Sequence, residues 1–330
     1  MQTEVIRQRI QSNLYRIQKG QKIAVYPYGE TGRDTRAVLE EYGVQPTYIV
    51  DNYSKELGIM NFDTFMKYYD ENTVILFTIE SRAIFLKLME QMLLAGIRAQ
   101  NIVVMQMIQL VSYEALEKII NDKKHVSVLD IGCGQGIQGR FMSDYGKEVT
   151  GITISDEDGY DGRCLKNVIK ADFLTVELEQ KYDIVWASHI LEHIMDVEGF
   201  LRKMKEAVAP GGCLALTVPR ENSILLPHIH SFSAGRLLRY MLCAGYDCRN
   251  AQILEYGYNI SIILPEVRYI EREFNVDGFV DESANATGAD DLFLYLPKEI
   301  KLSKSWDNIY YFNGNIYELN WDKSNHKIFL

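Results

Sequence analysis

The spacing of apolar residues predicts two successive series of strands and helices. In the first series, apolar runs typical of buried strands alternate with stretches of helical periodicity. We expect these strands at 22–27, 47–51, 73–79 and 102–107. Before them, Ile6, Ile10, Leu14 and Ile17 lie three or four residues apart. The pattern predicts a docking helix followed by a small parallel α/β unit.

A second series follows a linking helix expected at 112–122. Its strands are expected at 127–131, 149–153, 167–172, 182–188 and 213–219. After a helix at 233–244, two β-rich runs at 248–255 and 258–264 flank Gly257, which predicts an antiparallel pair at one sheet edge. This series therefore predicts an α/β fold with a doubly wound, Rossmann-like sheet of seven strands, the last pair antiparallel.

The last 65 residues have a different pattern, with a polar stretch at 281–291 followed by NIYYF and NIYEL. Asn313-Gly314 separates these two runs, which predicts a hairpin. The expected organisation is an N-terminal helix at 1–20, an α/β domain at 21–110, a linker helix at 111–122, a main domain at 123–265 and a β-rich extension at 266–330.

Composition excludes several classes of protein. The 330 residues carry a net charge of -10, the wrong sign for passive attraction to nucleic acid. No apolar run is long enough for a membrane span and the first residues lack the apolar centre of a signal peptide, so a cytoplasmic protein is expected. Five cysteines without CxxC pairing indicate neither a disulfide framework nor a structural zinc site.

The main chemical motif is VLDIGCGQG, where an apolar strand ends and a helix begins. Glycines in such a loop let backbone N–H groups approach a ligand at a helix N-terminus. A dinucleotide-binding fold also places glycines after a strand, so the loop alone leaves both cofactor classes open.

Four further stretches resolve this ambiguity by resemblance. With Asp130 two residues before Gly132, the loop resembles motif I of class I S-adenosylmethionine (SAM)-dependent methyltransferases. ADF at 171–173, YDIVWASHILEHI, APGG at 209–212 and PHIHSFSAGRLLRYMLCAGYD are similar to later segments of that family. The resemblance covers residues 123–265.

The resemblance implies SAM as cofactor, S-adenosylhomocysteine as product, and a set of binding residues. Gly132, Gly134 and Gly136 would line the amino-acid and ribose part, Asp130 would order the loop, and Asp172 and Phe173 would meet the adenine. Cys133, Ile154 and Ser188 adjoin these positions. Thr153 stands where the family usually has an acidic residue that holds the ribose; threonine occurs there in the cyclopropane-fatty-acid-synthase-like branch, and Asp156 is a candidate substitute.

Transfer of the sulfonium methyl group to a hydroxyl requires in-line alignment and removal of the hydroxyl proton. Histidine suits the base role because its ordinary pKa of about 6.5 lies near neutrality. We rank His228 first, with His193 and His189 as further candidates, whereas strand-like alternation would turn His230 away. A packing or capping role remains open for His193.

His189-Ile-Leu-Glu192-His193 also matches a zinc-peptidase pattern, in which two histidines one helical turn apart bind metal. That pattern requires a long helix, whereas this segment directly follows a strand. No metal ligand is therefore assigned.

The first α/β series contains YPYGETGRD and, at the next strand end, Asp51-Asn52. Pro27 replaces the first glycine of the dinucleotide pattern, which argues against ordinary dinucleotide binding. Residues 21–110 resemble the N-terminal Rossmann-like unit of nucleotide-sugar acyltransferases. This resemblance implies a sugar nucleotide near Gly29, Gly32 and Asp51; a scaffold with an empty crevice is the alternative.

The preferred hypothesis is a SAM-dependent methyltransferase acting on a hydroxyl of a saccharide, nucleotide sugar or similar small metabolite in glycan biosynthesis. Carbon methylation and a non-catalytic SAM- or nucleotide-binding regulator are the alternatives. The C-terminal extension is expected to cover the acceptor site or to mediate homodimerisation.

Overall fold

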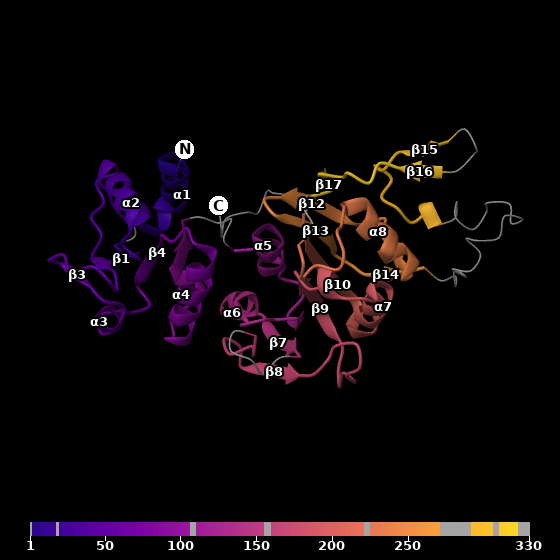
Figure 1. Cartoon of the computed structure of the whole chain (residues 1–330), viewed down its shortest axis with the longest axis horizontal. Helices are drawn as coiled ribbons and strands as arrows, with labels where there is room; N and C mark the ends of the chain where they lie inside the picture. Colours follow the sequence, from indigo (N-terminus) through magenta and orange to yellow (C-terminus); the bar gives the residue numbers. More distant parts are fainter. Residues whose placement is uncertain are drawn as a thin grey trace, which may run out of the picture. The chain divides into compact units, whose positions relative to one another are not determined.

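The computed structural model describes residues 2–17, 20–105, 110–154, 160–220, 225–270, 292–305 and 310–322 (Figure 1). The chain folds into two compact units. Unit 1 comprises residues 1–113, 140–146 and 325–330, and unit 2 comprises 114–139 and 147–324. Among the described residues, no helix has the length and apolar character needed to cross a membrane.

Unit 1 contains a five-stranded parallel sheet in the order β3-β2-β1-β4-β5. The strands are β1 (Lys22–Tyr26), β2 (Tyr48–Val50), β3 (Ile59–Met60), β4 (Thr73–Phe77) and β5 (Ile102–Val104). The helical elements are α1 (Gln2–Ile17), α2 (Glu30–Glu41), α3 (Phe62–Met66), α4 (Arg82–Leu94) and η1 (Ala99–Asn101). The sequence pattern missed β3, because a strand of two residues has no readable alternation.

The docking-helix prediction is confirmed for the described part of α1. Ile6, Ile10 and Ile17 are buried and belong to the same apolar cluster as Ile23 and Val25 of β1. Burial of one helical face on the sheet thus holds α1 in unit 1.

Unit 2 contains an eight-stranded sheet in the order β17-β12-β13-β10-β9-β6-β7-β8. The strands are β6 (Ser127–Ile131), β7 (Glu148–Thr153), β8 (Asn167–Lys170), β9 (Tyr182–Ser188), β10 (Val208–Pro219), β12 (Gln252–Tyr256), β13 (Asn259–Leu264) and β17 (Glu318–Leu319). The expected antiparallel pair is present as β12 and β13. The count of seven was wrong, because β17 pairs with β12 and adds an eighth strand.

Helical elements accompany these strands, and one of them has its last residues, 140–144, in unit 1. These are α5 (Tyr113–Asn121), which overlaps the predicted linking helix, α6 (Ile137–Asp144), η3 (Leu191–His193), α7 (Val197–Ala207) and α8 (Ala234–Cys243). Figure 1 shows α7 and α8 side by side, and their apolar residues join one core with β9 and β10. Two small pairs lie outside the main sheet, β11 (Tyr246–Asp247) with β14 (Arg268–Tyr269) and β15 (Leu302–Lys304) with β16 (Tyr310–Phe312).

The predicted hairpin at Asn313-Gly314 is wrong. The run before this dipeptide forms β16 and pairs with β15, whereas the run after it forms β17 and pairs with β12. Gly314 instead lies against Gly235 in the first turn of α8, and its carbonyl accepts a hydrogen bond from the Gly235 N–H at 2.9 Å. Long-range packing therefore replaces the local turn.

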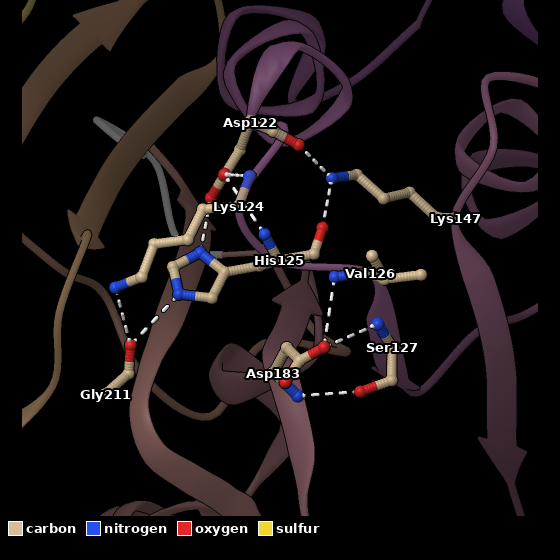
Figure 2. Close-up of polar contacts among 8 residues, drawn as sticks. All are labelled: Asp122, Lys124, His125, Val126, Ser127, Lys147, Asp183 and Gly211. Atoms are coloured by element: carbon tan, nitrogen blue, oxygen red, sulfur yellow. Dashed lines mark hydrogen bonds and ion pairs between the residues drawn. The ribbon is translucent and has the colours of Figure 1, made fainter.

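A polar network joins the amino ends of the central strands (Figure 2). Asp183 of β9 accepts hydrogen bonds from the N–H groups of Val126 and Ser127 at 3.0 Å each, and its own N–H donates to the Ser127 hydroxyl at 2.9 Å. The His125 Nδ1 lies 2.6 Å from an Asp122 carboxylate oxygen, and its Nε2 lies 3.0 Å from the Gly211 carbonyl. These bonds fix the start of β6 against β9 and β10.

We predict that Asp183→Ala lowers the free energy of unfolding by about 2 kcal/mol at pH 7, because two backbone N–H groups lose a charged acceptor. These N–H groups hold the pKa of Asp183 below its usual range. A lowered folded-state pKa stabilises the protein above the unfolded pKa, and that stabilisation is lost as the pH falls.

Thermal unfolding at pH 7 and near pH 3 tests this. The difference between wild type and variant should shrink at the lower pH. Glu206→Ala, which removes an exposed partner of Lys203, is the control and should change little. An Asp183→Ala effect no larger than that of the control would contradict the assigned role.

Candidate active site

The glycine loop connects β6 to α6 and takes a backbone path that favours glycine. Gly132, Gly134 and Gly136 have φ of 71°, 54° and 81°. A Cβ at Gly132 would lie 2.3 Å from the Ile190 side chain, and one at Gly136 would lie 2.8 Å from Leu165. Gly134 has open space beside it. Two glycines are thus needed for packing, while the third leaves room on the loop for a ligand.

Asp130 lies beneath this loop, at the end of β6. It is 2% exposed, and its Oδ2 has no hydrogen-bond partner within the protein. Burial raises the pKa of Asp130 to about 7, partly opposed by a hydrogen bond from the Gly139 N–H. Asp130 thus packs against Gly139 of α6 beneath the glycine loop, which fits a residue that orders the loop.

Of the predicted cofactor residues after β7 and β8, some are exposed and one is buried. Ile154 is 79% exposed after β7, and Asp172 is exposed after β8. Thr153 is buried and donates a hydrogen bond to the Tyr160 carbonyl at 2.8 Å, so its hydroxyl serves the structure of the loop. Asp156, its proposed substitute, lies outside the described residues.

Two other predicted cofactor residues point their side chains into the protein. Phe173 is 4% exposed and packs edge-on against Phe200 of α7, with ring centroids 5.2 Å apart. The Cys133 thiol lies against Gly151 and Gly162, and burial raises its pKa to about 12. In this conformation both residues can meet a cofactor through the backbone alone. Ser188 closes β9 opposite Thr217 of β10.

Three histidines lie around Glu192, just beyond the carboxyl end of β9. Glu192 is 1% exposed, with its Oε1 3.4 Å from His189 Nδ1 and 3.8 Å from His193 Nε2. His228 stands edge-on to His193, with ring centroids 4.9 Å apart. The Glu192 carbonyl accepts hydrogen bonds from the N–H groups of Ile229 and His230, which holds the segment after β10 on the cluster.

His189 is held on two sides. Its Nε2 lies 2.8 Å from the Asn259 side-chain oxygen, its Nδ1 faces Glu192, and its ring stacks on Tyr258. Because both ring nitrogens face oxygen acceptors, His189 is better suited to positioning Glu192 than to accepting a proton. Its φ of 54° lies in the left-handed region, which a histidine inside a helix cannot adopt. The zinc-peptidase pattern, with both histidines on one helix, is therefore absent.

His193 and His228 have different surroundings. His193 Nδ1 lies 2.8 Å from the Pro227 carbonyl, and the side chain is 43% exposed. Burial lowers the pKa of His228; the Glu192 carboxylate opposes this shift, and His193 and His189 add to it. His228 is therefore neutral at pH 7 and able to accept a proton. His230 packs near Phe232 with its Nε2 buried, in agreement with its lower rank.

Glu192 is a candidate site residue that sequence reasoning missed. The sequence presents it only as part of the zinc-peptidase pattern, yet its carboxylate is the common neighbour of the histidines. Ligand atoms of Glu192, His193 and His228 lie within 4.8 Å of one another, close enough to hold a divalent ion. This contrasts with the expectation that no residue binds metal.

The glycine loop lies at the start of α6, after β6. The histidine cluster lies at the carboxyl end of β9, the neighbour of β6 in the doubly wound sheet. Comparisons with known proteins agree with this class. Residues 104–250 match the family model described as a methyltransferase domain. This part of the chain matches a methyltransferase domain, for which SAM is the implied cofactor, as predicted from the sequence. The match begins at residue 104, so the acyltransferase resemblance of residues 21–110 stays a prediction.

Two curated relatives are named as O-methyltransferases. A ubiquinone biosynthesis O-methyltransferase of Leptothrix cholodnii is 25% identical over 171 residues, which cover 43% of this chain and 73% of that protein. A malonyl-[acyl-carrier protein] O-methyltransferase of Pseudescherichia vulneris is 28% identical over 115 residues, 34% of this chain and 45% of that protein. The chain thus spans under half of the second relative. A solved SAM-dependent methyltransferase from Archaeoglobus fulgidus is similar over 49% of this chain and 94% of its own, with 17% identity and a TM-score of 0.42.

We predict that Gly134→Leu abolishes binding of S-adenosylhomocysteine, because the new side chain would occupy the open space on the loop. Calorimetric titration measures the loss. Gly146→Leu is the matched control, since Gly146 also has positive φ and open space beside it. Equal affinity in wild type and Gly134→Leu would refute the assignment of the loop.

We also predict that Asp130→Asn changes the pH dependence of stability. A carboxyl whose folded-state pKa is raised contributes stability fully below its unfolded pKa of about 4, and loses it as the pH rises towards 7. Asparagine has no charge to desolvate. Relative to wild type, the variant should therefore gain about 4 kcal/mol at pH 8 compared with pH 4, since the pKa is raised by about three units. Thermal unfolding at both pH values measures this gain, and an unchanged difference would argue against an ionising, buried Asp130.

Proposed function

We propose that the protein is a SAM-dependent O-methyltransferase with a small polar acceptor. The observation that carries the proposal is the juxtaposition of the glycine loop and the histidine cluster. Ile190, which lies between His189 and the rest of the cluster, is the side chain in contact with Gly132. An acceptor bound over the cluster would therefore lie next to the loop that is proposed to hold the methyl donor.

In this proposal each part of the site has one task. The glycine loop and Asp130 bind SAM, whose sulfonium supplies the methyl group when it is bound. His228 takes the proton from the acceptor hydroxyl as the oxygen attacks the methyl carbon. Glu192 stabilises the imidazolium that results, and His189 and Asn259 orient Glu192. His193 lies on the solvent-exposed side of the histidine cluster, because its side chain is more exposed than those of His189 and Glu192.

Two observations bear on the class of methyl acceptor, namely the relatives named above and the resemblance of residues 21–110. The relatives named above act, by their names, in ubiquinone biosynthesis or on an acyl-carrier protein, whereas the resemblance of residues 21–110 favours a saccharide or nucleotide sugar. We propose the saccharide class, as part of glycan biosynthesis. Carbon methylation would need no base to deprotonate a hydroxyl. A regulator would bind SAM without turnover. Each alternative therefore differs from the proposal in the result expected when His228 is replaced.

We predict that His228→Ala lowers kcat by about 10² to 10⁴ while S-adenosylhomocysteine binding stays unchanged, because the variant loses the base and keeps the loop. In the wild type, kcat/KM should fall on the acid side with an apparent pKa below 6.5, since the pKa of His228 is lowered and only its neutral form accepts a proton. Both are measured by transfer of labelled methyl groups to a panel of saccharides and nucleotide sugars.

Full activity of His228→Ala would remove the base role. His230→Ala is the matched control in the same segment and should keep most activity. Treatment with a chelator separates a base from a metal centre: the proposal requires unchanged activity. Loss of activity that a divalent ion restores would instead make Glu192, His193 and His228 metal ligands.

A further inference from the structure

Unit 1 contains a cavity of about 490 Å³ that the proposed methyl transfer does not use. Loops after β1, β2 and β4 line it, so it lies at the carboxyl ends of these parallel strands. In the order β3-β2-β1-β4-β5, the chain runs from β1 to one side and later returns to the other side as β4. The cavity is therefore at the topological switch point, where doubly wound sheets bind ligands.

The charges of the cavity favour a ligand rich in hydrogen-bond donors. Three carboxylates line it, from Glu30, Asp51 and Glu80, against the single ammonium group of Lys87. Glu30 stands in the first turn of α2, where a bound phosphate would need positive potential. The Thr31 hydroxyl donates to Glu80 and so keeps a second carboxylate beside this helix start.

The glycines of this segment do not by themselves exclude a pyrophosphate. The second glycine position of the dinucleotide pattern, Gly29, has open space beside it, so it is the carboxylates of Glu30 and Glu80 that disfavour a diphosphate at the start of α2. At the third glycine position, a Cβ at Gly32 would lie 2.7 Å from the Pro27 carbonyl oxygen. Gly32 thus serves the packing of α2 against the strand end.

Among the hydrogen-bond acceptors that line the cavity, Asp51 has the best-defined position. Its Oδ1 accepts hydrogen bonds from the N–H groups of Tyr53 and Ser54 at 2.8 and 2.9 Å, which fixes the carboxylate after β2. In doubly wound folds an acidic residue at this place accepts hydrogen bonds from ribose hydroxyls. Tyr53 is 93% exposed and Ile84 is 47% exposed, so an aromatic and an aliphatic face are available to cover a ring.

We propose that this cavity binds a polyhydroxylated ring, the sugar of a nucleoside or a free saccharide, through Asp51 and without a pyrophosphate contact. The site is independent of the proposed methyl transfer, because all of its lining residues belong to unit 1. Recognition of vicinal hydroxyls by a carboxylate is the chemistry that both ligand sources share.

The test uses the full chain saturated with S-adenosylhomocysteine, so that an adenosine-like probe cannot enter the cofactor site. Uridine, adenosine, glucose and glucosamine are titrated by calorimetry and saturation-transfer NMR, with UDP-glucose and NAD as pyrophosphate-containing probes. At least one probe without phosphate should bind, and UDP-glucose should bind no more tightly than the better of uridine and glucose. The nucleoside and hexose arms distinguish the two sources.

Two variants locate the binding. Asp51→Asn keeps an oxygen for the turn but loses the charge, and should weaken binding about tenfold. Ile84→Glu should weaken it as well, whereas Asp63→Asn, an exposed acid on α3, should not. Circular dichroism and thermal unfolding report whether each variant is folded, because the cofactor site lies in unit 2 and does not report on unit 1. The proposal fails if no probe without phosphate binds, if UDP-glucose or NAD binds at least tenfold more tightly, or if both cavity variants bind as the wild type does.

Discussion

Strand β6 is the constraint on which unit 2 depends. It pairs with β7 on one side and β9 on the other, and its apolar residues are completely buried. Asp183 fixes its amino end, while the glycine loop turns at its carboxyl end. Because the strand cannot slip without reversing which side chains face each side of the sheet, the two ends are locked in one register. Hydrogen bonds at the amino end of β6 thus help to fix the position of the glycine loop at its carboxyl end.

Much of this fold was predictable because its signals are local or repeat regularly. Apolar runs of strand length predicted β6 to β10, and Gly257 between two β-rich runs predicted the β12 and β13 pair. Apart from the two-residue β3, the failures involve contacts between distant residues. β17 pairs with a strand more than 60 positions earlier, and Gly314 meets Gly235 in place of forming a hairpin. A strong local turn signal was overridden by packing that no local pattern encodes.

The site was predictable to a similar, partial degree. Glycine spacing predicted the turn between β6 and α6, because positive φ leaves a direct mark on residue choice. The roles of the histidines could not be separated by sequence, since they depend on which ring nitrogen meets which oxygen. Asn259, which faces His189, lies 70 residues after it. Likewise, burial of the Phe173 and Cys133 side chains depends on α7 and on Gly151, and no motif around the two residues shows it.

The position of Cys133 bears on how the loop withstands oxidants and electrophiles. A cysteine in the middle of a cofactor loop is an obvious target for modification, yet only the thiolate reacts readily. With its pKa raised to about 12 and its sulfur against Gly151 and Gly162, the thiol stays protonated at neutral pH. Gly151 of β7 and Gly162 of the following loop therefore leave room for the Cys133 sulfur to pack against them. This packing protects the thiol from modification, which would block ligand binding at the loop.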